Sequence, residues 1–277
     1  MKLTVLIDNS TIIDKPFLGE PGLSLLIETE DAKVVFDCGY SPVFLSNARK
    51  MGITMTEITK VVLSHGHNDH SGGLAALGKL LQREGKRVPI VLHPACFEKK
   101  WWRNEDGSIE KIGMPGDREF LERYFEVLPT EQPLKIADSL YFLGAIPRRD
   151  PAANEPVGLV VNRENLLIPD FVPEDSAIVF DGKEGLVVIN GCAHSGLVNI
   201  LSYTQALFPG KPIAAVLGGF HMLSKDQEWL EAAAKKIKAF EPHRIYPCHC
   251  TDEVSRAYLR SILSVGAIGV GSVLLFQ

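Results

Sequence analysis

The chain has 277 residues, of which 45% are hydrophobic and 23% charged, and its formal net charge at pH 7 is −5. This length can bury a substantial core in one domain, with or without an insertion. The negative charge argues against nucleic-acid binding along a broad basic surface. No apolar run approaches the roughly 20 residues of a membrane span, no signal-peptide pattern opens the chain, and the five scattered cysteines do not form a secreted disulfide framework. We therefore expect a reduced, cytoplasmic protein that binds neither nucleic acid nor membrane.

Three short strands are predicted at the start of the chain. They cover residues 2–8, 22–29 and 33–37, which are rich in Val, Leu and Ile and are separated by Gly, Pro and Asp. The third strand ends at Asp37, shortly before a predicted helix over residues 41–51 with proline near its start. Asp37 either bonds backbone amides in this turn or lies beside the functional site, and both interpretations stay open.

A loop rich in metal-binding side chains follows the next strand, predicted over residues 59–64. It contains His65, His67, Asp69 and His70, and it closes on a Gly-Gly pair. Imidazole nitrogen and carboxylate oxygen are ligands that suit zinc, iron and manganese. Because the segment is too short for a helix with ligands four residues apart, we expect a strand-to-loop turn around metal, with glycines that permit close backbone approach. The alternative, a histidine-rich surface loop, does not explain the position directly after a buried strand.

Strands and helices then alternate, which is typical of sheets covered by helices. Residues 94–125 interrupt this pattern with dense charge and a group of aromatic side chains. The aromatic residues of the group are Trp101, Trp102, Phe120, Tyr124 and Phe125. We predict a lid or subdomain inserted over the metal site, where aromatic and basic side chains would bind a flat anionic ligand. The alternative is a solvated hairpin whose aromatic residues pack on the core.

The pattern His-x-His-x-Asp-His at residues 65–70 resembles the metal motif of the metallo-β-lactamase superfamily. Later segments resemble its branch named after 7,8-dihydropterin-6-yl-methyl-4-(β-D-ribofuranosyl)aminobenzene 5'-phosphate synthase. The resemblance implies an α/β fold, a four-layer αββα sandwich formed by one domain over residues 1–277, with the insertion at 94–125. It also implies two divalent metal ions, with zinc as the first choice and manganese or iron as alternatives. Where the flavodiiron oxidoreductases of this fold have a glutamate, this chain has His67, which favours hydrolytic chemistry.

One ligand that the resemblance implies is missing from the chain. A strand predicted over residues 139–146 ends at Pro147-Arg148, where most members have a Pro-Gly-His turn whose histidine binds metal. An arginine at this place can hold a phosphate or carboxylate by bidentate hydrogen bonds. We therefore predict that Arg148 binds substrate, and a solvated loop arginine is the alternative.

Two candidate ligands follow a hairpin predicted from strands at 177–180 and 186–189. Cys192 stands where the superfamily places a bridging aspartate or, in one β-lactamase subclass, a cysteine. His194 lies two residues later, and we predict that it replaces the missing imidazole. Cys192 is a further candidate metal ligand, and the alternative for it is a small buried thiol.

Histidines also stand at the ends of two later strands, predicted over residues 212–217 and 244–247. His249 resembles the last metal histidine of the superfamily, so we predict that it binds the second metal ion. His221 follows two glycines and is predicted to contact substrate or to donate a proton; the alternative is a partly buried histidine at a helix start. Thr251 is expected to be the N-cap of the last helix.

The resemblance divides the predicted ligands into two sets. His65, His67 and His194 would hold one metal ion, and Asp69, His70 and His249 would hold the second. Two cations together lower the pKa of a shared water from about 15.7 toward 7, which creates a nucleophile at neutral pH. Asp69 would also orient this water and is therefore a catalytic candidate.

We therefore predict a dinuclear metal-dependent hydrolase, or a related transferase or synthase. It would use a metal-bridging hydroxide on a small anionic substrate that contains a ring and a phosphate. The alternative is a metal-bearing ligand-binding or regulatory protein with little turnover, which the missing histidine keeps open. An RNA-processing nuclease is disfavoured by the net charge.

Overall fold

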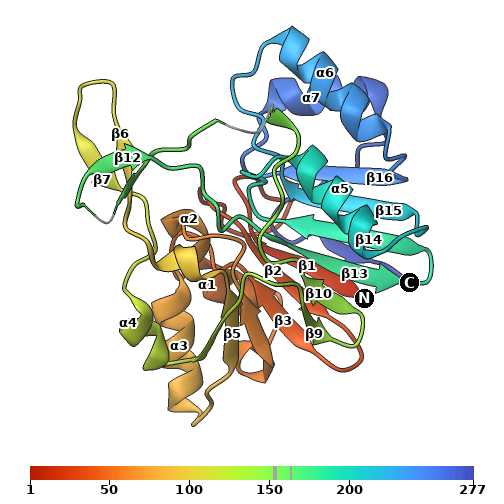
Figure 1. Cartoon of the computed structure of the whole chain (residues 1–277). Helices are drawn as coiled ribbons and strands as arrows, with labels where there is room; N and C mark the ends of the chain where they lie inside the picture. Colours follow the sequence, from red (N-terminus) through yellow and green to blue (C-terminus); the bar gives the residue numbers. More distant parts are fainter. Residues whose placement is uncertain (152–154, 163) are drawn as a thin grey trace.

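The computed structural model describes residues 1–151, 155–162 and 164–277. Two β-sheets stack face to face in the centre of the molecule, and helices cover their outer faces (Figure 1). This arrangement confirms the predicted four-layer αββα sandwich. Within the described ranges, no helix has both the length and the apolar character that crossing a membrane requires.

The first sheet contains the N-terminal strands and the strand that precedes the histidine-rich loop. Its order is β17 (Val273–Leu275), β1 (Lys2–Ile7), β2 (Ser24–Glu28), β3 (Lys33–Phe36), β4 (Lys60–Val62), β5 (Pro89–Leu92) and β8 (Glu126–Pro129). From β3 to β8 neighbouring strands run parallel, so β3 and β4 end at the same edge. Helices α1 (Val43–Lys50) and α3 (Leu74–Arg83) bury Phe44, Leu77 and Leu81 against the outer face.

The second sheet carries the later candidate residues. Its order is β16 (Arg244–Cys248), β15 (Ile213–Gly219), β14 (Gly185–Asn190), β13 (Ala177–Gly182), β10 (Leu140–Phe142) and β9 (Leu134–Ala137). Strands β14, β15 and β16 run parallel, which brings their carboxyl ends to one edge. Helices α5 (Leu197–Leu207), α6 (Gln227–Lys238) and α7 (Glu253–Ile262) pack on the outer face. Buried side chains such as Phe36 and Phe142 fill the space between the two sheets.

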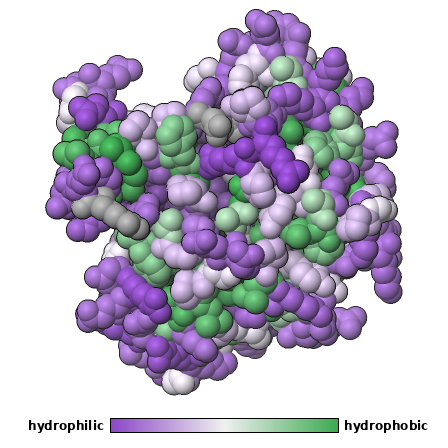
Figure 2. Space-filling model, viewed as in Figure 1, coloured by the Kyte–Doolittle hydropathy of each residue, from purple (hydrophilic) through white to green (hydrophobic). Residues whose placement is uncertain are grey.

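A smaller third sheet projects from the sandwich (Figure 1). Its order is β12 (Leu167–Pro169), β11 (Leu159–Val161), β6 (Lys100–Arg103) and β7 (Ile109–Lys111). Figure 2 shows apolar side chains gathered on this projection, in agreement with the exposure of Trp102 and Leu167. The projection combines two separate parts of the chain, whereas the sequence predicted one continuous insertion over residues 94–125.

The remaining elements are short and lie at the sandwich margins. They are η1 (Met55–Glu57), α2 (Asn68–Ser71), η2 (Pro94–Phe97) and α4 (Arg118–Glu122). Helix α2 forms one turn inside the segment that was expected to be a loop. Gly72 allows this turn to approach the carbonyl of Tyr40, since a Cβ at Gly72 would lie 2.0 Å from that oxygen.

The N-cap of the last helix differs from the prediction. The carboxylate of Asp252 accepts a hydrogen bond from Ser255 N and caps α7. Thr251 instead accepts a bond at its hydroxyl oxygen from Phe220 N, 3.0 Å away. Thr251 thereby joins the end of β16 to the end of β15, and the cap lies one residue later because aspartate fills the capping role.

Candidate metal centre

The histidine-rich loop leaves β4 and turns its imidazoles into the space between the two sheet edges. His65 is fully buried and His67 almost so. Nε2 of His65 lies 3.0 Å from Nδ1 of His67, and Nδ1 of His65 lies 2.8 Å from the hydroxyl of Ser64. The ring of His65 is therefore fixed by its neighbour in the chain and faces a second imidazole.

Asp37 at the end of β3 holds the loop in place. Its two carboxylate oxygens accept hydrogen bonds from Ser64 N at 2.8 Å and from Ser64 Oγ at 2.7 Å. Oδ2 of Asp37 also lies 2.7 Å from Nδ1 of His70. Of the two interpretations of Asp37, the structure therefore supports the one beside the functional site, where the carboxylate orients His70 and leaves its Nε2 facing the cluster.

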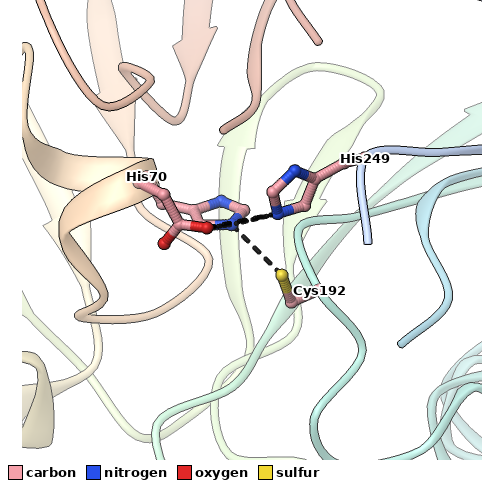
Figure 3. A group of neighbouring side chains, drawn as sticks. His70, Cys192 and His249 are labelled. Carbon is pink, nitrogen blue, oxygen red and sulfur yellow. Dashed lines mark hydrogen bonds and ion pairs between the residues drawn. The ribbon is translucent and has the colours of Figure 1, made fainter. Parts of the chain in front are cut away.

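Cys192 and His194 enter the cluster from the loop after β14. Nε2 of His194 lies 3.2 Å from Nε2 of His65, and Sγ of Cys192 lies 3.2 Å from Nε2 of His70. Figure 3 shows the Cys192 sulfur and the His249 imidazole directed toward His70 from different elements. The sulfur therefore lies among the imidazoles, in contrast to a thiol packed only against apolar side chains.

Buried polar groups position this second loop. A carboxylate oxygen of Asp175 accepts hydrogen bonds from the backbone N and the hydroxyl of Ser195. The guanidinium of Arg148 donates to the carbonyl of His194 at 3.2 Å, and also to the carbonyls of Phe171 and Val172. These contacts give Arg148 a positioning role, and its contact with substrate stays a prediction.

His249 lies at the end of β16 and completes the cluster. Its Nε2 is 3.1 Å from Nε2 of His70 and 3.4 Å from Oδ2 of Asp69. Nδ1 of His249 lies 3.0 Å from the amide oxygen of Asn9, and its backbone N donates to Asp8. Asp8 and Asn9 were not among the predicted site residues, although polar residues directly after an apolar strand were a signal for them.

The structure brings all seven predicted metal ligands together. Their ligand atoms form three overlapping groups, which are Asp69, His70, Cys192 and His249; His65, Cys192 and His194; and His65, His67 and Asp69. Asp69, His70 and His249 lie in one group, as the sequence predicted, and Cys192 is a fourth member of that group. The predicted set of His65, His67 and His194 is divided between two groups, and His65 belongs to both.

The spacing and chemistry of these atoms fit transition-metal ions. Two nitrogen ligands at 2.0–2.1 Å from a tetrahedral zinc ion lie roughly 3.3 Å apart, and the facing imidazole nitrogens lie 3.0–3.2 Å apart. Among the described residues, Nε2 of His67 and Nδ1 of His194 are buried without a hydrogen-bond partner. The other nitrogens of these two rings, Nδ1 of His67 and Nε2 of His194, both face Nε2 of His65, which is the kind of imidazole cluster that binds a zinc ion.

The pKa values differ across the cluster. Burial lowers the pKa of His67 to about 3 and lowers that of His65 well below its ordinary value, so both imidazoles are neutral, as metal ligands must be. Burial also acts to lower the pKa of His70, but the charges of Asp69 and Asp37 outweigh it and raise that pKa to about 9. A metal ion that binds His70 would therefore displace a proton.

A cleft of about 340 Å³ leads to the cluster. It is lined by His67, Asp69, Cys192, His194 and His249, and also by His221, Tyr40, Asn9, Ile112 and Val157. His221 has a φ of 51°, a backbone conformation that is rare for residues other than glycine. The ring centroid of His221 lies 4.5 Å from that of His194. The predicted substrate or proton-donor residue thus borders the cleft and belongs to none of the three ligand groups.

The aromatic residues of segment 94–125 do not reach this cleft. Among the described residues that line it, none is Trp101, Trp102, Phe120, Tyr124 or Phe125. Phe125, Phe120 and Tyr124 pack against the core under the first sheet. The packing alternative therefore applies to these three, and a flat ligand stacked on this segment is not supported.

A buried ion cluster in the same segment was missed by the sequence interpretation. Nζ of Lys100 lies 2.6 Å from Asp170 and 2.9 Å from Glu174, and all three side chains are almost completely buried. Glu174 also accepts a hydrogen bond from Gly66 N at 3.3 Å, in the histidine-rich loop. Lys100 is one of the basic side chains of segment 94–125 that were predicted to bind an anionic ligand. It instead connects the third sheet to the metal loop.

Comparison with known proteins identifies the family of the chain. Residues 18–249 match the family model of the metallo-β-lactamase superfamily. The chain is 26% identical over 268 residues to the 7,8-dihydropterin-6-methyl-4-(β-D-ribofuranosyl)-aminobenzene-5'-phosphate synthase of Methanocaldococcus jannaschii, covering 91% of this chain and 87% of the relative.

Solved structures give the same result. Tm1679, described as a metal-dependent hydrolase of the β-lactamase superfamily, is 30% identical, with a TM-score of 0.83 over 99% of this chain and 98% of its own. The metallo-β-lactamase fold protein YhfI of Bacillus subtilis has a TM-score of 0.63 at 15% identity, over 99% of each chain, and shows the fold alone. The extent of the family match and the buried cluster at the sheet edges lead to one conclusion: the chain belongs to the metallo-β-lactamase superfamily.

Proposed function

We propose that the chain is a dinuclear metal-dependent hydrolase, or a related transferase or synthase, that acts on a small anionic substrate. The observation that carries this proposal is the convergence of seven ligand-type side chains in three overlapping groups. In a structural zinc site four protein ligands fill the coordination of the ion, whereas a catalytic site keeps at least one coordination position open for water or substrate. The cluster here borders a cleft of about 340 Å³, which supports the catalytic alternative.

In this proposal the ligands are shared between two ions. Asp69, His70, Cys192 and His249 would hold one ion. His65, His67 and His194 would hold the other, which requires His67 and His194 to move closer together and leaves its fourth position open. Zinc is proposed first, because the set combines imidazole, carboxylate and thiolate donors that zinc accepts together. When bound, the cations would polarise a phosphoryl or acyl oxygen and lower the pKa of water near them.

Residues around the cluster would handle substrate and protons. Oδ2 of Asp69 lies 3.7 Å from His70 and 3.4 Å from His249, so this carboxylate can accept a proton from water between the two sheet edges. His221 borders the cleft with a buried Nδ1 that has no partner among the described residues. This nitrogen would donate a hydrogen bond or a proton to a leaving group.

The substrate preference would come from the bound cations. Among the described residues that line the cleft there is no lysine or arginine, and Arg148 is committed to backbone carbonyls. An anionic group would therefore be attracted by the metal ions themselves. A ring-containing phosphate as substrate is supported by the name of the synthase relative, which includes a pterin, an aminobenzene and a phosphate.

The test is a chelator-controlled activity screen of the zinc-loaded protein. Phosphomonoesters, phosphodiesters, thioesters and lactones are assayed with and without a chelator, beside the double variant His65→Ala/His67→Ala. We expect turnover of at least one class that disappears with chelator and in the variant. Full metal occupancy with no turnover of any class would instead favour the metal-bearing binding protein. Turnover that survives both treatments would contradict a metal-dependent reaction.

A further inference from the structure

A second cavity lies beside the metal cluster, between helices α5 and α6. It holds about 100 Å³ of space. Its walls are mainly apolar and include Leu197, Val198, Phe220, Trp229, Ala233 and Ile237. Burial of an apolar group against such walls is favourable in proportion to the apolar area removed from water.

The cavity and the metal cleft share part of their walls. His194, His221 and Val157 line both, so the two imidazoles stand between the cavity and the cluster. Within the described residues, Nδ1 of His194 and Nδ1 of His221 are buried and without a hydrogen-bond partner. A ligand that occupies both spaces would pass these two nitrogens.

The backbone beside this wall is also unusual. Ala193 and His221 have φ values of 54° and 51°, and neither is a glycine or asparagine. Non-glycine residues in this conformation cost about 1 kcal/mol or more and gather at ligand sites. Both residues line the cavity, so the strained positions coincide with the boundary between the two spaces.

The charged groups at the rim are paired with one another. Lys225 lies 2.7 Å from Glu155, and Lys236 lies 2.7 Å from Asp150. Lys225 also stands over the ring of Trp229, 5.0 Å from its centroid. The pairs join Lys236 of α6, and Lys225 just before it, to the segment on either side of residues 152–154, and the cavity between them has mainly apolar walls. Its chemistry therefore suits an uncharged apolar group.

We propose that this cavity, the α5–α6 pocket, binds the aromatic ring of a ligand whose anionic group reaches the metal cluster. The second half of this statement rests on the proposed function, whereas ring binding in the pocket does not. An apolar cavity of roughly 150 Å³ accommodates benzene, so a space of about 100 Å³ excludes a fused ring system and takes one ring when its wall side chains shift outward. The α5–α6 pocket would thus bind the ring that the aromatic side chains of segment 94–125 were predicted to bind.

Ring binding is tested by the fluorescence of Trp229. The chain has three tryptophans, at positions 101, 102 and 229, so the variant Trp101→Phe/Trp102→Phe keeps only the one in the pocket. Titration of the zinc-loaded protein with benzyl alcohol should give a saturable change in emission. Ala233→Leu fills the pocket and should raise the Kd by about ten-fold. Ala239→Leu, at the exposed end of the same helix, should leave the Kd unchanged.

The folding of each variant is checked by its thermal unfolding midpoint. If Ala233→Leu does not fold, Val198→Leu on the opposite wall serves as the filling variant, with the same expected increase in Kd. A change in emission that does not saturate would overturn ring binding. An equal effect of the filling variant and Ala239→Leu would overturn it as well.

The connection to the metal cluster is tested with two phosphonates. Benzylphosphonate should bind the zinc-loaded protein about ten-fold more tightly than methylphosphonate in calorimetry, and Ala233→Leu should remove this difference. Equal affinities in the wild-type protein would overturn the connection. A protein that holds no metal and binds neither phosphonate, but still binds benzyl alcohol, would contradict the proposed function. Ring binding in the α5–α6 pocket would still be supported.

Discussion

The two sides of the candidate metal centre are built differently. On the N-terminal side, His65, His67, Asp69 and His70 come from one short loop at the end of β4. On the C-terminal side, Cys192 and His194 follow β14, and His249 follows β16, more than 50 residues later. The first side is a local motif, whereas the second exists only because parallel strands bring their ends together.

The supporting contacts differ in the same way. Asp37 and Ser64 hold the N-terminal loop from the neighbouring strand end. The C-terminal ligands depend on partners from distant segments, such as Arg148 for the carbonyl of His194 and Asn9 for the ring of His249. Changes on the N-terminal side should therefore affect metal affinity, and changes among the distant partners should affect stability as well.

The largest effect is expected from His65→Ala. His65 belongs to two of the three ligand groups but not to the group of Asp69, His70, Cys192 and His249, so its loss should remove one of the two proposed ions and lower metal content to about one equivalent. His221→Ala is the matched control, because His221 borders the cleft outside the groups and should keep its metal while turnover falls. Elemental analysis of both variants measures this. Equal metal content in the His65→Ala variant and the wild type would show that the groups do not bind metal as proposed.

The second largest effect is expected from Asp37, which orients His70 on the N-terminal side. Asp37→Asn removes the charge that lies 2.7 Å from Nδ1 of His70, and loss of such a partner typically lowers metal affinity by about 10–100-fold. Asp14→Asn is the control, since Asp14 is exposed and has a similar φ of 60° against 59° for Asp37. Zinc affinity by competition with a chromogenic chelator distinguishes them. An unchanged zinc affinity in Asp37→Asn would show that this carboxylate does not support metal binding by His70.

The contact of Glu174 that joins the third sheet to the N-terminal loop should make stability depend on pH. Burial and the charge of Asp170 raise the pKa of Glu174 from an ordinary 4.5 to about 7, against the opposing effect of Lys100. Between these values the folded chain binds more protons than the unfolded chain, so stability falls as pH rises from about 4.5 to about 7. The loss is on the order of 3 kcal/mol at most.

Glu174→Gln should remove this part of the pH dependence. The amide oxygen can still accept from Gly66 N, so the variant should lose less stability than the wild type between pH 5 and pH 8. Denaturant unfolding in chelator at the two pH values measures the difference. If wild type and variant lose equal stability over this interval, Glu174 is already ionised at low pH in the folded chain.

The smallest effect is expected from Arg148→Met on the C-terminal side. Loss of the hydrogen bonds to His194, Phe171 and Val172 should lower the free energy of unfolding by about 2 kcal/mol. Arg149→Met, at an exposed neighbouring position, should change it by less than about 0.5 kcal/mol. The variants are compared by urea unfolding in the presence of a chelator. If Arg148→Met binds phosphonate more weakly and keeps its stability, the result would support the prediction that Arg148 binds substrate.

The local features of the chain could be predicted from its sequence. The His-x-His-x-Asp-His motif, the apolar strands and the amphipathic helices each depend on neighbouring residues, and the family resemblance of the motif implied the four-layer fold. Cys192, His194 and His249 could be selected because a ligand-type residue directly after an apolar strand is unusual. Their convergence on one cluster then followed from the family resemblance.

Features that depend on distant partners could not be predicted in this way. Lys100 is preceded by Glu98 and Lys99 and looks like a surface residue, yet Asp170 and Glu174 bury it. Arg148 looks like an anion-binding residue, yet three carbonyls occupy its guanidinium. In both cases the partner lies more than 20 residues away along the chain, and only the folded structure shows which charge meets which group.

The central claim is that both sides of the centre bind metal together. The most direct measurement is the metal content of protein purified without a chelator, loaded with zinc and dialysed against metal-free buffer. The account predicts close to two equivalents of zinc in the wild type and about one in His65→Ala. A wild-type protein that retains less than one equivalent of any transition metal would contradict it.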